Sequence, residues 1–225
     1  MVEVTSVVGN FRDELGKTFA AVGEAFPELY VVTADVSKST RSRMFGERWP
    51  DRFYSVGIAE ADAVGIAAGI ASFGGPVIFT AYGVFATEKP FEQIRNCLCY
   101  PNLNVKIVAT HGGISVGEDG ATHQAVEDIA IMRALPNMKV LVAADPGEVR
   151  GAVFAALQTP GPVYVRLGRG VGAPSTWSRK RSTSGWGRAR SCGTARTSRS
   201  LRWASWWSGP CAPRSCWRRR ASRRR

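Results

Sequence analysis

The feature that most constrains the fold is a regular alternation, up to residue 170, between short apolar runs rich in β-branched residues and longer segments with helical periodicity. The short runs predict strands, and apolar residues spaced three or four apart predict helices. Strands that are separated by helices pair in parallel, and runs apolar on both faces suit central strands covered by helices on each side. The sequence therefore predicts one doubly wound α/β domain with a mostly parallel sheet.

The strands are expected at Leu29–Ala34, Phe53–Val56, Val77–Tyr82, Val105–Thr110, Lys139–Ala143 and Val163–Leu167. The helices are expected at Phe11–Phe26, Ala59–Phe73, Pro90–Tyr100, His123–Ala134 and Pro146–Leu157. Asn10 is a candidate N-cap for the first of them. The second is apolar nearly all round and carries Gly65 and Gly69, which would let a neighbouring backbone approach closely. Because it is too short to span a bilayer, we expect a buried or interface helix.

The formal charge of +12 is confined to the C-terminal part of the chain. Residues 1–170 hold 15 Lys and Arg against 18 Asp and Glu, a net charge of −3, whereas residues 171–225 hold 15 basic residues and no acidic one. The sequence thus divides into a mildly acidic domain over 1–170 and a basic tail over 171–225. Nucleic acid or an anionic membrane surface is the usual partner of so basic a chain, but the acidic domain predicts neither specific nucleic-acid binding nor membrane binding.

The tail has an unusual composition, with six of the seven tryptophans among Arg, Ser and Gly and without apolar periodicity. We expect it to be disordered and to come from out-of-frame translation of GC-rich DNA. With a suitable choice of codons, Ser215 to Arg224 reads one base earlier as an amphipathic helix, and the gene sequence tests this hypothesis. The alternative is a truncated, non-catalytic product whose tail binds RNA or membranes nonspecifically. Deleting 171–225 would then abolish nucleic-acid binding.

Five cysteines without a C-x-x-C pair, and two histidines without metal-type spacing, argue against a disulfide framework and a metal site. The sequence shows neither a signal-peptide pattern nor a run of about 18 apolar residues. These patterns predict a cytoplasmic protein that does not span a membrane.

Two segments at predicted strand ends carry chemical groups. Glu60 lies in VGIAEAD, at the start of a helix, where an acid interacts favourably with the helix dipole and needs no other role. The loop GEDGATHQ (117–124) contains Asp119 and His123, and His111 precedes it. Ligands of open α/β sheets bind at the carboxyl ends of the strands, so these side chains can be functional. They can equally be ordinary loop residues that are solvated or hydrogen-bonded locally.

Taken together, these segments resemble the pyrimidine-binding domain of the transketolase family over nearly all of residues 10–170. The resemblance is carried by VGIAEAD, AYGVF with FEQIR, THGGISVGEDGATHQAVEDIA, ALPNMKVL and GPVYVRLGR. A match of this length is far more specific than a lone glycine motif. It implies a thiamine diphosphate-binding fold and a thiamine diphosphate-dependent transferase.

The resemblance implies that Glu60 and His123 are catalytic, with Glu60 bonded to the aminopyrimidine of the cofactor. A carboxyl group there favours the imino tautomer, whose nitrogen can remove the acidic thiazolium proton. Tyr82 and Phe85 match the aromatic wall of the pyrimidine pocket, although such residues also pack in ordinary cores.

By the same resemblance, the substrate is a sugar phosphate. Asp119 and His123 match positions that bind sugar hydroxyls, and the phosphate-binding positions are matched by Arg12, Ser39, His111 and Arg169. Two arginines with a serine and a histidine suit a phosphate monoester, although each arginine alone could be a solvated surface charge.

The family's second module, which binds the diphosphate through Mg²⁺, has no counterpart in this sequence. The resemblance therefore implies a partner, the N-terminal section of a split transketolase, in an expected dimer of heterodimers. The implied activity is transfer of a two-carbon ketol unit from a ketose phosphate to an aldose phosphate, as in the pentose phosphate pathway. Deoxyxylulose phosphate synthase and the β subunit of oxo-acid dehydrogenases share the fold and stay as alternatives.

Overall fold

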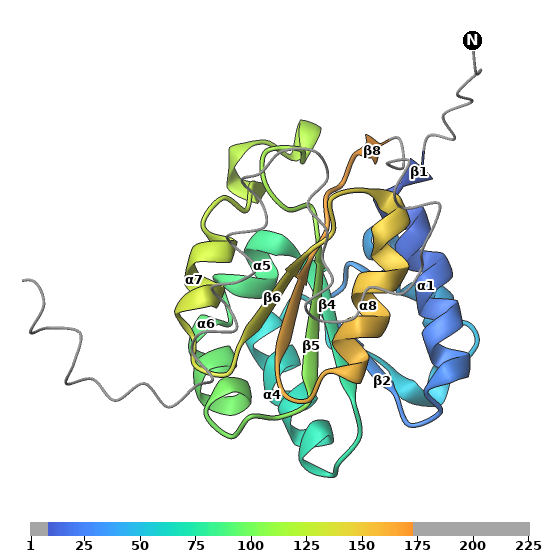
Figure 1. Ribbon diagram of the computed structural model, residues 1–225, viewed down its shortest axis with the longest axis vertical. Coiled ribbons are helices and arrows are strands. Elements are labelled where there is room, and N and C mark those ends of the chain that lie inside the picture. Colours follow the sequence, from blue (N-terminus) through green and yellow to red (C-terminus); the bar gives the residue numbers. More distant parts are fainter. Residues whose placement is uncertain (1–8, 173–225) are drawn as a thin grey trace, which may run out of the picture. The chain divides into compact units, whose positions relative to one another are not determined.

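The computed structural model describes residues 9–172, which form a three-layer α/β domain (Figure 1). The central sheet has six strands in the order β3-β2-β4-β5-β7-β6, and every neighbouring pair is parallel. The predicted doubly wound parallel fold is therefore confirmed. The expectations for the tail beyond residue 172 lie outside the described residues.

All six predicted strands are present, and two have the predicted bounds. They are β2 (Tyr30–Thr33), β3 (Phe53–Ser55), β4 (Val77–Tyr82), β5 (Val105–Thr110), β6 (Lys139–Val142) and β7 (Val163–Arg166). A short antiparallel pair that the sequence pattern did not predict joins β1 (Gly9–Asn10) to β8 (Val171–Gly172). This pair brings the two ends of the described segment together.

The helices divide between the two faces of the sheet, as Figure 1 shows for α1 and α8 on one side and α4 to α7 on the other. Successive residues of β4 point to opposite faces, so that Ile78 packs with α1 (Phe11–Ala25), α3 (Arg43–Gly46) and α8 (Val149–Gln158). Phe79 packs instead with α4 (Glu60–Ser72), η2 (Ile94–Cys99) and α7 (Asp128–Ala134). Burial on both faces explains why the central strands are almost continuously apolar.

Asn10 caps α1, since its side chain accepts a hydrogen bond of 2.9 Å from the backbone N–H of Arg12. Other helices differ from the prediction. The expected helix at Pro90–Tyr100 is α6 (Phe91–Gln93) followed by a π-helical turn over Ile94–Cys99. The short helices α2 (Ser37–Thr40), α3 and α5 (Gly83–Thr87) were not predicted. The remaining 3-10 turns are η1 (Pro50–Arg52), η3 (Gly117–Asp119), η4 (Ala121–His123) and η5 (Pro146–Glu148).

The helix expected to begin at His123 begins at Asp128. Between η4 and α7, Ala125 forms bridges with Gly112 and Gly113, which tie the end of this loop back to its start. The loop therefore stands as a closed unit beyond the carboxyl end of β5.

Within residues 9–172, no helix combines the length and the apolar character that crossing a bilayer demands. Helix α4 has one buried face, but open space surrounds its Gly65 and Gly69. One face of the helix is therefore buried as predicted, and the prediction of an interface applies to the open face.

Candidate functional site

Glu60 is the first residue of α4 and lies at the carboxyl edge of the sheet, just after β3. Glu60 is only 6% exposed, and both of its carboxylate oxygens accept hydrogen bonds from the Nζ of Lys89, at 3.2 and 3.1 Å. The positive end of the helix dipole also favours a negative charge at this position. The carboxylate is thus held, nearly buried, at the edge where ligands of such sheets bind.

Four rings gather next to this carboxylate, at the ends of β4 and β5. Tyr82 stacks on His111 with ring centroids 3.8 Å apart and on Phe85 with centroids 6.1 Å apart. The ring of His123 meets the Phe85 ring edge-on at 5.0 Å. Lys89 connects the group to Glu60, because its Nζ lies 4.8 Å from the centre of the Phe85 ring. The structure therefore brings together Glu60, Tyr82, Phe85 and His123, which the sequence placed in the cofactor and sugar sites.

His111 is almost fully buried and has a left-handed backbone with φ of 62°. Its Nδ1 lies 2.7 Å from the Thr110 hydroxyl. Burial, and after it the charges of Arg169 and Arg12, lower the pKa of His111 from 6.5 to about 4. The imidazole is therefore neutral at physiological pH and can donate or accept a hydrogen bond without a charge of its own.

Arg169 and Arg12 place positive charge around His111. Arg169 donates hydrogen bonds to Asp119 at 3.2 Å and to Glu118 at 2.5 Å, which closes the loop after β5 over the end of β7. The Nε of Arg12 is buried and has no hydrogen-bond partner among residues 9–172. A guanidinium group whose buried Nε has an unused proton suits an anion, because a buried donor that lacks a partner is costly.

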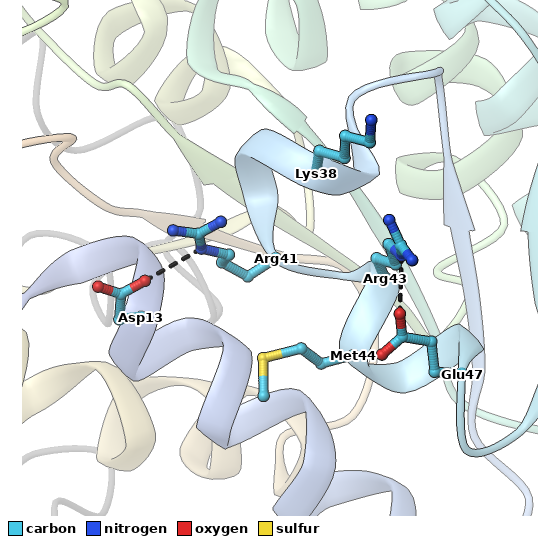
Figure 2. Close-up of a pocket in the computed structure, with 6 residues that line it drawn as sticks. All are labelled: Asp13, Lys38, Arg41, Arg43, Met44 and Glu47. Carbon is cyan, nitrogen blue, oxygen red and sulfur yellow. Dashed lines mark hydrogen bonds and ion pairs between the residues drawn. The ribbon is translucent and has the colours of Figure 1, made fainter.

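Ser39 is the one predicted site residue that the structure does not join to the others. It is half-buried in α2, and its hydroxyl makes no hydrogen bond to another predicted site residue. On the same side of the fold, a cavity of about 490 Å³ lies between α1, α2 and α3 (Figure 2). Its lining residues are Asp13, Lys38, Arg41, Arg43, Met44 and Glu47. Two of the three cations are neutralised there, Arg41 by Asp13 at 3.0 Å and Arg43 by Glu47 at 2.7 Å, so the cavity itself assigns no ligand.

The sequence reasoning missed the residues that hold the loop after β5. Asp128 is buried and accepts hydrogen bonds from the Tyr164 hydroxyl at 2.6 Å and from the Nε of Arg166 at 2.7 Å. Arg166 also donates to the Ala125 carbonyl, at 3.2 Å, and packs against Gly112 so closely that a Cβ there would lie 2.9 Å from its Nε. These contacts fix both ends of the loop that carries Asp119 and His123. Their only sequence signal is an acid at the start of a helix.

In the segment from residue 9 to residue 172, no group of three or more His, Cys, Asp or Glu side chains could hold a metal ion. The acidic side chains of the loop are instead engaged by Arg169.

A doubly wound sheet with a buried carboxylate, stacked rings and a cationic cluster at its carboxyl edge defines an α/β domain whose edge is suited to an aromatic, anionic ligand. The family described as "Transketolase, pyrimidine binding domain" matches residues 9–173. The chain therefore belongs to the transketolase pyrimidine-binding domain family. Membership implies the use of thiamine diphosphate, and a buried carboxylate beside aromatic faces fits the aminopyrimidine ring of that cofactor.

Known relatives include both complete and split proteins. A "Putative transketolase C-terminal section" from Methanocaldococcus jannaschii is 45% identical over 169 residues, which cover 75% of this chain and 54% of that protein. The 1-deoxy-D-xylulose-5-phosphate synthase of Dictyoglomus thermophilum is 35% identical over 173 residues, which cover 76% of this chain and 28% of that enzyme. The structure of a split gene transketolase, an inactive β4 tetramer, has a TM-score of 0.69 and 43% identity, covering 80% of this chain and 57% of that one. The chain thus spans about half the length of the putative transketolase C-terminal section and less than a third of the synthase.

Proposed function

We propose that this chain is the C-terminal subunit of a thiamine diphosphate-dependent transketolase, which transfers a two-carbon ketol unit from a ketose phosphate to an aldose phosphate. The observation that carries the proposal is the nearly buried Glu60 beside Phe85, with the cluster of Arg12, His111 and Arg169 at the same edge of the sheet. A carboxylate for the cofactor and cations for a sugar phosphate then lie in one site. This chemistry would place the enzyme in the pentose phosphate pathway.

When bound, thiamine diphosphate supplies a nucleophilic carbon and an electron sink. In this proposal, Glu60 hydrogen-bonds the aminopyrimidine nitrogen and shares a proton with it, and the rings of Phe85 and Tyr82 orient that heterocycle by stacking. A nearly buried carboxylate suits this task because water competes poorly for its oxygens.

The substrate would be held by the loop after β5 and by the cations around it. His123 and Asp119 are proposed to bind sugar hydroxyls. Arg12, Arg169 and the neutral His111 are proposed to bind the phosphate. Ser39 is proposed as a further phosphate ligand from α2. Because Arg169 already pairs with Glu118 and Asp119, we expect the phosphate to draw on the unused Nε of Arg12 first.

We further propose that the N-terminal section of a split transketolase completes the site and holds Mg²⁺ and the diphosphate, in a dimer of heterodimers. Exposed apolar side chains support a partner at this edge, since Ile58 is 77% exposed next to Glu60 and Ile114 is 76% exposed in the loop after β5. Exposed apolar residues beside an active site are typical of surfaces that another chain covers. The likeness to a split gene transketolase supports a separate N-terminal section as the partner.

The test is ketol transfer by the chain together with its N-terminal section, thiamine diphosphate and Mg²⁺. Glu60→Gln, which keeps the shape of the side chain, should lower kcat by at least about 100-fold, the range typical of a lost proton-transfer group. Asp13→Asn, in an exposed ion pair with Arg41, is the matched control and should leave the rate unchanged. Full activity of Glu60→Gln would refute the proposed role of this residue.

A second candidate is favoured by the 35% identity to 1-deoxy-D-xylulose-5-phosphate synthase. The two candidates are distinguished by their product, because the relative is a synthase of 1-deoxy-D-xylulose 5-phosphate. Formation of this product, without ketol transfer between sugar phosphates, would replace the first proposal by the second.

A further inference from the structure

Lys89 lies in the turn after α5 and makes both of the contacts that the proposed function gives to the aminopyrimidine ring. Its ammonium group donates to the two oxygens of Glu60 at 3.2 and 3.1 Å, and it lies 4.8 Å from the centre of the Phe85 ring. A heterocycle that stacks on Phe85 and turns a nitrogen toward Glu60 needs the same space. Lys89 and the aminopyrimidine therefore compete for one position.

The ion pair is asymmetric, and the asymmetry tells which partner can move. The Glu60 side chain is 7% exposed, whereas the Lys89 side chain is 50% exposed. Among the described residues, Glu60 receives no side-chain hydrogen bond except from Lys89, and the Nζ of Lys89 donates to no other residue. Without Lys89 the carboxylate would be a nearly buried, unpaired charge, which is costly. The lysine, in contrast, regains full hydration when its flexible stem swings outward.

We propose that Lys89 is a displaceable placeholder for the aminopyrimidine: it neutralises Glu60 in the free chain and leaves when the cofactor enters. The inference rests on the proposed function. Lys89 is then a positioning residue that sets cofactor affinity, since only the fraction of molecules with Lys89 swung away can accept the ring. The apparent dissociation constant rises in inverse proportion to that fraction.

The direct test compares Lys89→Met, which keeps the stem and removes the charge, with Lys89→Arg, which keeps the charge. Each variant is assembled with the N-terminal section and Mg²⁺, and the dissociation constant of thiamine diphosphate is measured by calorimetry. We expect Lys89→Met to bind about threefold to tenfold more tightly than wild type, because no competing cation has to be displaced. Lys89→Arg should stay within about twofold of wild type. Weaker or unchanged binding by Lys89→Met overturns the proposal.

A second measurement follows Lys89 itself in the wild-type complex. Lysines of the full chain are labelled by reductive ¹³C-methylation, and the Lys89 resonance is assigned by its loss in Lys89→Arg. In the complex, thiamine diphosphate should shift this resonance toward its position in Glu60→Gln. A resonance that stays in place on saturation shows that Lys89 keeps its pair with Glu60, and the proposal fails.

These readouts separate the inference from the proposed function. A complex that binds the cofactor more tightly as Lys89→Met but transfers no ketol unit overturns the transketolase activity and leaves the placeholder role intact. Ketol transfer with unchanged cofactor affinity in Lys89→Met supports the transketolase activity and overturns the placeholder role. A complex that binds no thiamine diphosphate overturns both.

Discussion

The two edges of the central sheet treat buried ionisable groups in opposite ways. At the amino edge, the fully buried Lys106 of β5 donates to three oxygens, the Asn104 side chain and the Thr159 carbonyl at 2.6 Å and the Gly161 carbonyl at 2.5 Å. At the carboxyl edge, the buried Nε of Arg12 has no partner within residues 9–172, and Glu60 relies on a half-exposed lysine.

The difference distinguishes structural from functional burial. An ammonium group has three protons, and Lys106 uses each of them on an oxygen of its own chain. The groups at the carboxyl edge keep unused or displaceable bonds, which a ligand or a second chain can take. Buried polar atoms that lack partners are rare in folded proteins, so the unpaired Nε of Arg12 supports a ligand site at this edge.

The largest effect should come from removing the fully hydrogen-bonded ammonium group of Lys106 at the amino edge. Lys106→Met keeps the stem but removes the donor from three oxygens, and at about 1 kcal/mol for each lost hydrogen bond we expect a loss of about 3 kcal/mol in the free energy of unfolding. Urea denaturation of the full chain measures it. Lys139→Met is the matched control, because among the described residues Lys139 donates one side-chain hydrogen bond, to the Pro160 carbonyl at 2.7 Å, and it is only partly buried. It should lose less than about 1 kcal/mol, and equal losses in both variants would contradict the comparison.

The second effect concerns pH and the carboxyl edge. Since the pKa of His111 falls from 6.5 to about 4 on folding, the unfolded chain binds more protons between these values, and stability is lost as the pH drops from about 6.5 to 4. At about 1.4 kcal/mol per pKa unit, the loss approaches about 3 kcal/mol near pH 4 and is much smaller at pH 6. The measurement is the difference in unfolding free energy between wild type and His111→Gln across this range, which subtracts the carboxylates common to both chains. Parallel curves would show that His111 does not titrate in this way.

The sequence predicted the sheet better than the site. Strands β4 and β5 have the predicted bounds because their burial on both faces leaves an almost continuous apolar signal. Lys106 lies inside one of these runs, and no local pattern shows that its ammonium group finds three oxygens around residues 104, 159 and 161.

The site residues were identified from the family resemblance, and their mutual contacts depend on residues far apart in the chain. The pair between Lys89 and Glu60 spans 29 residues, and the contact of Arg169 with Asp119 spans 50. One local signal did exist, since Lys89 follows Phe85 by four residues, the spacing at which side chains meet on a helix. The start of α7 was misplaced because the bridges of Ala125 to Gly112 and Gly113 override the helical periodicity of the preceding residues.

The smallest expected effect on the stability of the chain comes from a substitution on α4, the helix that begins at Glu60. The same substitution should change association with the partner in the opposite direction. A Cβ added at Gly65 meets nothing within 4 Å, so Gly65→Ala should stabilise the chain by about 0.5–1 kcal/mol through its helix propensity alone. If the N-terminal section packs closely on this face, the added methyl group should weaken association about tenfold, the equivalent of about 1.4 kcal/mol of overpacking. Thermal unfolding of the chain and sedimentation of the complex measure the two quantities separately. Lys17→Ala on the exposed side of α1 is the control and should leave association unchanged. A Gly65→Ala chain that is more stable and associates normally would show that the N-terminal section does not pack closely on α4. The open face of this helix would then be ordinary solvent-exposed surface, unlike the carboxyl edge of the sheet.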